Sequence, residues 1–412
     1  MNINKFSIFK PSFYDDFQCK TSKCRNNCCA AGWQITIGKS DYFKALNASK
    51  GLKINEDVKK VYQRNKKTEN DGMYAKMKLN DDGRCPFLNE KSMCTLQLTC
   101  GYNCLSSVCR DYPRICAYNN NVFFRTLSLS CEAVSEKLWE LKDGIDFVMD
   151  DCDEKMKTDL KKSASLISNI DSDRNIMSIL TVIIDTLQNR NFSFEQRLFV
   201  LGIAMKNLAD TSSDSDFTFE KWQEKYSYLA TDFNADELWK SVDHNSQKFV
   251  FNNILISKAI IMITSLLKNK STNFWINTLS NISVNIRENN VSTDCSYSVE
   301  KYKLQSDLYD SFFKDKDYFF ENVMVMCAIH IIGEKKDFTY WDLYLAICAA
   351  YSSFKFTIKA NINENTNIEN ICDCISQVSV YFLHSSYIDG VVQSLKNNDS
   401  DTLASMQYLI FD

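Results

Sequence analysis

The chain has 412 residues, with 48 basic and 52 acidic side chains and a formal net charge of -4. This length exceeds one usual hydrophobic core and predicts about two or three domains. Its 45% hydrophobic and 24% charged residues are typical of folded proteins and argue against a disordered or fibrous chain. Because the charges nearly balance, there is no basic surface for a polyanion, and we expect no nucleic-acid partner.

The N-terminal segment MNINKFSIFKPSFYDDF lacks the basic start, unbroken apolar run and cleavage site of a secretory signal. We therefore expect a cytoplasmic protein with reduced thiols, in which clustered cysteines bind metal or catalyse rather than form disulfides. The most apolar later stretch, residues 250–268, is interrupted by Asn252, Asn253 and Lys258. These polar residues favour a buried helix over a membrane span, so no membrane partner is expected.

The first motif along the chain is a dense cysteine group. The segment FQCKTSKCRNNCC places Cys19, Cys24, Cys28 and Cys29 within eleven residues. Thiolates are soft ligands that suit zinc and iron–sulfur clusters, and cysteine is the usual ligand of an iron–sulfur centre. The three histidines lie far along the chain and offer these cysteines little help. Because adjacent side chains diverge, one member of the Cys28–Cys29 pair is expected to serve a second centre or to pack.

Further cysteines follow in the segments RCPFLNEKSMC, CLSSVCRDYPRIC and LSLSC, and eleven of the 17 cysteines lie at or before Cys131. A tetrahedral centre needs about four thiolates, so this number exceeds the needs of one site. Either there are two centres or several cysteines are bystanders. The cysteines of the later part are interpreted as small buried hydrophobic residues. They are Cys152, Cys295, Cys327, Cys348, Cys372 and Cys374.

The chain divides into two parts of different character. All three prolines and six of the ten glycines lie at or before Pro113, where residues 33–38 and 122–130 alternate like short strands. We predict an irregular, cysteine-rich, metal-binding domain at residues 1–145.

The second part lacks proline entirely, which favours long helices. Apolar residues recur there at helical spacing. These stretches are 175–186, 195–208, 250–268, 321–333, 341–353 and 376–395. Residues 210–216 and 361–370 are polar and are expected to be exposed loops. We predict a mainly α protein whose residues 146–412 form an all-helical domain that binds a substrate or partner.

The cysteine segments resemble the flagellin lysine-N-methylase family, whose N-terminal part is similar to small zinc- or iron-chelating proteins. The resemblance runs through four ordered blocks, FQCKTSKCRNNCCAAGWQITI, RCPFLNEKSMCTLQ, LSSVCRDYPR and FFRTLSLSCEA. It implies eight metal-binding cysteines. They are Cys19, Cys24, Cys28, Cys29, Cys85, Cys94, Cys109 and Cys131.

The same comparison marks Cys100, Cys104 and Cys116 as additional cysteines without a metal role. The chain departs from the family pattern at Thr126, where serine is usual, and at Glu132, where proline is common. Neither change removes an implied metal ligand.

The resemblance implies a cytoplasmic lysine N-methyltransferase that uses S-adenosylmethionine and an iron–sulfur cluster, most simply [4Fe-4S], with flagellin as the protein substrate. The sequence contains no GxGxxG motif, so a conventional nucleotide-type pocket is not evident, and a cluster could bind the cofactor through an open iron position instead. Whether the transfer is radical or polar stays open at this point.

Lysine methylation requires a neutral amine, which a desolvated pocket with a nearby acceptor would favour. Candidate acceptors close to the thiols are Asp111, Tyr112 and Tyr118, and Arg114 or Arg125 could balance negative charge. Each of these residues has an equally simple structural role in packing or ion pairing.

Two other readings of the cysteines stay open. In the first, zinc stabilises the N-terminal domain and the helical part is a non-enzymatic module that binds a protein partner. In the second, the cysteines form disulfides, which the missing secretory signal argues against.

Overall fold

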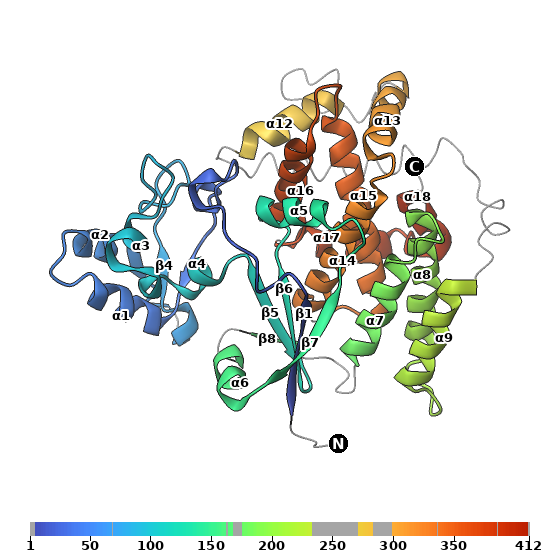
Figure 1. Cartoon of the computed structure of the whole chain (residues 1–412), viewed down its shortest axis with the longest axis horizontal. Helices are drawn as coiled ribbons and strands as arrows, with labels where there is room; N and C mark the ends of the chain where they lie inside the picture. Colours follow the sequence, from blue (N-terminus) through green and yellow to red (C-terminus); the bar gives the residue numbers. More distant parts are fainter. Residues whose placement is uncertain are drawn as a thin grey trace.

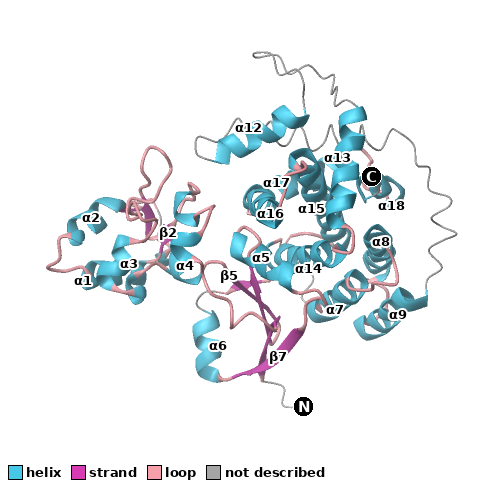
Figure 2. Ribbon diagram, turned by 45° about the horizontal axis from the view of Figure 1, so that its top comes forward, coloured by secondary structure: helices cyan, strands magenta, loops and turns pink. Residues whose placement is uncertain are grey.

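We analysed a computed structural model of the chain, which describes residues 5–67, 69–161, 164–167, 175–232, 271–282, 299–335, 337–384 and 386–410. Figures 1 and 2 show three parts: a small lobe, a central sheet and a large group of helices. The lobe, residues 19–111, contains most of the N-terminal cysteines and is here called the cysteine-rich lobe.

The cysteine-rich lobe has its own small core, in which Ile37, Ala45, Val58, Phe87 and Leu96 are buried. A three-stranded sheet has the order β2-β4-β3, with β2 at Thr36–Ile37, β3 at Tyr62–Arg64 and β4 at Ala75–Met77. Four α-helices and four short 3-10 helices complete the lobe. They are α1 (Lys39–Ala48), α2 (Ile54–Val61), α3 (Thr95–Cys100), α4 (Ser107–Asp111), η1 (Thr21–Lys23), η2 (Cys28–Ala30), η3 (Asp71–Met73) and η4 (Tyr102–Cys104).

The central sheet has five strands in the order β7-β1-β6-β5-β8. The strands are β1 (Phe6–Pro11), β5 (Arg114–Asn119), β6 (Val122–Leu127), β7 (Phe147–Cys152) and β8 (Ser165–Leu166). β1 pairs with β6 in parallel, and β5 pairs with β6 as an antiparallel hairpin. Because β1 precedes the lobe and β5 follows it, the lobe is an insertion between two parts of one sheet. β7 and β8 join this sheet from beyond residue 145, and a domain boundary there stays a prediction.

The rest of the described chain is largely helical, which confirms the prediction of a mainly α protein. The helices are α5 (Glu132–Glu140), α6 (Glu154–Lys161), α7 (Ile176–Leu187), α8 (Phe194–Thr211), α9 (Phe219–Asp232), α12 (Ser271–Ile282), α13 (Val299–Phe313), α14 (Asp317–Glu334), α15 (Tyr340–Asn361), α16 (Ile368–Phe382), α17 (Tyr387–Asn397) and α18 (Leu403–Ile410). Capping boxes at Ser193 and Thr339 begin α8 and α15.

The predicted helical stretches match these elements with two exceptions. The stretch 376–395 is divided between α16 and α17 by a break around His384, and the stretch 250–268 lies outside the described residues. The expected loop at 361–370 is confined to the residues between α15 and α16. Within the described part of the chain, no helix combines the length and apolar character needed to cross a membrane.

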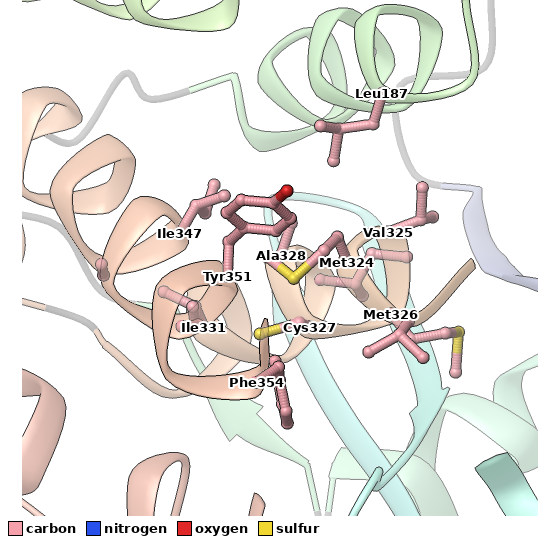
Figure 3. Close-up of a cluster of buried hydrophobic side chains, with 14 of the residues drawn as sticks. Leu187, Met324, Val325, Met326, Cys327, Ala328, Ile331, Ile347, Tyr351 and Phe354 are labelled. Carbon is pink, nitrogen blue, oxygen red and sulfur yellow. The ribbon is translucent and has the colours of Figure 1, made fainter. Parts of the chain in front are cut away.

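Helix α14 is the centre of the helical part, because side chains on all of its faces are buried. It packs on strands β5 and β6 on one side and on α7 and α15 on the other. Figure 3 shows Met324, Cys327 and Ile331 of this helix with Tyr351 and Phe354 of α15. Such a helix cannot present a polar face to water, so the sheet and the helices need each other to bury it.

The first prediction concerns Gly202 on α8, where a Cβ atom would lie 2.5 Å from Cζ of the buried Tyr344 ring and 2.6 Å from Cδ1 of Leu403. A Gly202→Ala substitution should therefore lower the free energy of unfolding by about 1–3 kcal/mol through overpacking. Gly390→Ala on α17 is the matched control, because nothing lies within 4 Å of its added Cβ. It should leave stability unchanged or raise it by up to about 1 kcal/mol. Chemical denaturation measures both, and equal stability of the two variants would contradict the packing at Gly202.

Candidate metal centre

One cavity of about 530 Å³ lies where the cysteine-rich lobe meets the start of α5. All eight cysteines that the family resemblance implies as ligands line it, from Cys19 to Cys131. The additional residues Cys100, Cys104 and Cys116 are not among the described residues that line the cavity. Its volume is in the range of small-molecule sites in proteins. The structure thus brings the eight thiols together, and their binding of a metal stays a prediction.

Four of these thiols form one group, here called the inner set: Cys29, Cys85, Cys94 and Cys109. Burial raises the pKa of Cys109 to about 12, and the other three thiols raise this pKa further. Burial and the neighbouring thiols of the inner set also raise the pKa of Cys85, to about 12. Burial and the thiol of Cys29 raise the pKa of Cys94 as well. The backbone N–H of Cys85 donates to the carbonyl oxygen of Cys29 over 2.8 Å. The four thiols are therefore close enough to raise one another's pKa values.

A second group, here called the outer set, consists of Cys19, Cys24 and Cys131. Burial raises the pKa of Cys131 to about 12, and the thiols of Cys24 and Cys19 add to this increase in pKa. Burial raises the pKa of Cys24 to about 11, and the neighbouring thiol of Cys19 adds to this increase. Cys28 lies between the two sets, since its side chain is hydrogen-bonded to that of Cys29. The adjacent thiols of Cys28 and Cys29 therefore stay close, although we expected them to diverge.

Backbone N–H groups are directed at three of the sulfur atoms. Cys94 is the N-cap residue of α3 and Cys131 is the N-cap residue of α5. Burial raises the pKa of both thiols, whereas the nearby backbone N–H groups of the first helical turn lower it. The N–H groups of the residues two and three positions after Cys85 lower the pKa of that thiol in the same way. N–H groups in such positions favour a thiolate, the form that binds metals.

The segment that carries the first four cysteines is held against α5 by Glu132. This carboxylate is 1% exposed and accepts hydrogen bonds from the backbone N–H of Arg25 at 3.0 Å and of Asn26 at 2.8 Å. The ammonium of Lys20 lies 3.0 Å from the same carboxylate. The Arg25 guanidinium also forms an ion pair with Asp373 on α16, in which Nε lies 3.0 Å from Oδ1. Glu132, the position where the family commonly has proline, therefore fixes the outer set to the helical part.

Two aromatic residues form one wall of the cavity. The rings of Trp33 and Tyr112 meet edge to face with centroids 5.2 Å apart. The hydroxyl of Tyr112 is 3.1 Å from Oγ of Ser130. On the other side, the Trp33 ring lies 5.4 Å from the ring of His384. This wall excludes water from one side of the thiols.

The other candidate residues near the thiols have structural roles, and they are not among the described residues that line the cavity. Tyr118 packs in the central sheet, and Asp111 forms a partly exposed ion pair with Arg110. Arg114 donates to a backbone carbonyl, and Arg125 lies over a tyrosine ring.

The sixteen cysteines in the described part of the chain are free thiols, and Cys295 lies outside it. The five later cysteines, Cys152, Cys327, Cys348, Cys372 and Cys374, are buried, as their interpretation as small hydrophobic residues requires.

A sequence profile of the FliB lysine N-methylase C-terminal domain matches residues 181–409, more than half of the chain. The lysine-N-methylases of Salmonella choleraesuis and Salmonella typhimurium are each 33% identical to the chain over 137 residues, which cover 33% of this chain and 33% of each relative. The flagellar biosynthetic protein FliU of Salmonella muenchen is 32% identical over 137 residues, 33% of this chain and 79% of that protein.

The chain thus spans one third of the length of the two curated methylases it matches. No solved structure matches it.

Proton release tests the state of the thiols. Because burial raises the pKa of the inner-set cysteines, these thiols are protonated near neutral pH and must lose their protons to bind a metal. Titration of Zn²⁺ into metal-free, reduced protein should release about four protons for each four-thiolate centre. Apparent affinity should fall as the pH is lowered, by about tenfold per pH unit for each proton displaced. Calorimetry in buffers of different ionisation enthalpy measures the number of protons released for each Zn²⁺ ion bound. Fewer than about two protons per ion would contradict a thiolate centre.

The role of Glu132 gives a second prediction at this site. Glu132→Gln replaces one carboxylate oxygen with an NH2 group, which cannot accept a hydrogen bond. Because the N–H groups of Arg25 and Asn26 bind different oxygens, one of the two bonds is lost together with the charge, and hydrogen bonds to charged groups contribute about 1.5–3 kcal/mol. We expect the free energy of unfolding and the amount of bound metal both to fall. Glu140→Gln is the matched control, because this glutamate lies on the same helix with a side chain that is 64% exposed. It should change stability by less than about 0.5 kcal/mol. Similar metal contents in the two variants would show that Glu132 does not position the cysteines.

Proposed function

The chain belongs to the FliB lysine N-methylase family, and on this premise we propose that it is a lysine N-methyltransferase that transfers methyl groups from S-adenosylmethionine to lysine side chains of flagellin. The observation that carries the proposal is the convergence of eight free thiols on one cavity, in a chain whose helical part matches the family. The names of the relatives, lysine-N-methylase and flagellar biosynthetic protein, support the proposed reaction and the proposed substrate.

The donor sets fit an iron–sulfur protein. The four neighbouring thiols of the inner set supply the number of ligands that one closed centre needs, and they would hold an iron–sulfur cluster or a zinc ion. The outer set provides three thiols, with Cys28 beside them, and is the better candidate for a [4Fe-4S] cluster with one iron position free of protein ligands. Such an iron position would supply a Lewis-acidic site for the methyl donor. In this proposal the chain therefore has two centres.

The residues around the thiols suit the needs of a lysine substrate. Its ammonium group has no lone pair and must lose a proton before it can accept a methyl group. The wall formed by Trp33 and Tyr112 would desolvate the lysine side chain and lower the pKa of its amine. The faces of the same two rings would hold the charged form during entry through cation–π attraction. Tyr112 itself stays protonated, because burial raises its pKa well above the ordinary value.

The helical part would supply the protein-binding surface. It matches the family over residues 181–409 and meets the cysteine-rich lobe at Glu132 and Arg25. A folded partner such as flagellin would contact this large part while one of its lysines entered the small cavity. We propose cytoplasmic flagellin as the substrate on this basis.

A methylation assay tests the proposed activity. Anaerobically purified protein should be brown, and with S-adenosylmethionine and flagellin from the organism that encodes the chain it should add methyl groups to lysines, detected by mass spectrometry. Cys24→Ser removes one outer-set ligand and should reduce the rate by at least about tenfold, the lower end of the loss seen for residues that only support metal ligands. Cys100→Ser is the matched control, because Cys100 belongs to the same lobe and lies outside the cavity lining. It should retain both colour and activity.

The opposite result favours another function. A colourless protein with stoichiometric zinc, no acid-labile sulfide and no methylated lysine would reject the methyltransferase. The inner set would then be a structural zinc site in a protein-interaction module, since four thiolates bind zinc equally well.

A further inference from the structure

A second group of metal-ligating side chains lies outside the cysteine cavity. His330 and Glu334 are one turn apart on α14, and His384 follows directly on the end of α16. One ligand atom from each of the three residues lies within 4.8 Å of the others. We propose that His330, Glu334 and His384 bind a divalent first-row transition-metal ion, such as Zn²⁺, at a site separate from the cysteines.

The geometry of the three side chains fits one ion. Nε2 of His330 lies 3.2 Å from Oε2 of Glu334, and Nδ1 of His384 lies 3.8 Å from Oε1 of the same carboxylate. The two imidazole rings meet edge to face with centroids 4.8 Å apart. Metal–nitrogen and metal–oxygen bonds are about 2.0–2.2 Å long, so ligand atoms of one ion are separated by little more than 3 Å. Small side-chain rotations would therefore close the site.

The environment of His330 is the observation that points to a bound ion. Its side chain is 1% exposed, and neither ring nitrogen has a hydrogen-bond partner of good geometry. An imidazole buried in this way loses the hydrogen bonds that water would give, which is unfavourable. Glu334 is close enough for an ion pair but is not aligned for a hydrogen bond to the ring. A metal ion between the imidazole and the carboxylate would satisfy both groups.

His384 is oriented in the manner of a metal ligand. Its Nε2 atom lies 2.8 Å from Oγ of Ser128 and 3.0 Å from Oγ of Ser130, which leaves Nδ1 on the side of Glu334. Histidine ligands commonly use one nitrogen for the metal and the other for such an outer hydrogen bond.

The charged side chains around the proposed site are compatible with a bound metal cation. Burial raises the pKa of Glu334, but the two histidines and Lys335 outweigh this effect and hold the pKa below its ordinary value, so the group is a carboxylate. The positive charge of Lys335 opposes a metal ion, and it is partly compensated by Asp389, whose Oδ2 lies 2.5 Å from Nζ of the lysine.

The position of the site suggests what the ion would do. Both histidines belong to the part of the chain that matches the family profile, and the Trp33 ring lies between His384 and the thiol cavity. Ser130, which contacts His384, directly precedes the cysteine at the start of α5. An ion here would join α14 to the end of α16 and fix the wall of the cavity. Three protein ligands also leave at least one position for water or for a substrate group.

Cobalt binding tests the proposal without any assay of methylation. Protein with its cysteine centres loaded should bind about one further equivalent of Co²⁺, with visible d–d bands and no thiolate charge-transfer band. His384→Ala should weaken binding by at least about tenfold and leave iron, zinc and sulfide contents unchanged. Glu334→Gln keeps the shape of a side chain that is 35% exposed, and it should weaken Co²⁺ binding similarly even if the histidine variant fails to fold.

The control separates the two kinds of centre. Cys109→Ser should reduce the metal content of the cysteine cavity and leave the Co²⁺ spectrum unchanged. Unaltered Co²⁺ affinity in Glu334→Gln, or a spectrum dominated by thiolate ligands in the loaded protein, would overturn the site. A protein that binds Co²⁺ as expected but does not methylate lysine would refute the proposed function alone.

Discussion

The contact between Glu132 and the backbone of Arg25 and Asn26 determines how the two halves of the molecule meet. Glu132 is one residue after a cavity cysteine and is almost fully buried, yet its charge is matched by two backbone N–H groups and by Lys20. A buried carboxylate is tolerated only with such partners, because an unpaired one would be strongly destabilising. The loop that carries Cys24 and the helix that begins after Cys131 are thereby held in one arrangement. Without this contact the outer set would not face the inner set across a common cavity.

The thiols of the inner set would bind a metal only after losing their protons. Each of them is buried near other thiols, so burial raises its pKa and keeps it protonated. Backbone N–H groups near Cys85, Cys94 and Cys131 oppose this effect. The lobe has a small core of its own and short strands, and a metal bound only by the folded form would add its binding free energy to stability. Metal binding and the folding of the lobe are therefore expected to be coupled.

The mainly α fold could be predicted from local signals, whereas the group of eight cysteines was implied by the family resemblance. Absence of proline after Pro113 and apolar residues at helical spacing are properties of neighbouring residues, and they led directly to α7, α8, α14 and α15. The division of the cysteines into two sets could not be predicted. Cys29 has its partners on segments far along the chain, and only the fold determines that Cys85 hydrogen-bonds to its carbonyl.

The histidines also make contacts that could not be predicted from the sequence. They are distant from the cysteines in sequence and were therefore given no part near the thiols, yet His384 packs against Trp33 of the cavity wall. The spacing of His330 and Glu334 on one helix was a readable signal, since residues four apart share a helix face. The third member could not be found from spacing, because it follows a different helix.

The insertion of the lobe into the sheet explains why the cavity lies at a junction. β1 and β5 flank the lobe in sequence and belong to the sheet on which α14 packs, so both ends of the lobe are fixed to the helical part. Motion of the lobe is consequently limited to the segments between these strands and the cavity, where Glu132, Arg25 and Trp33 make their contacts. Trp33 makes the most direct of these contacts, because it touches the cavity on one face and His384 on the other.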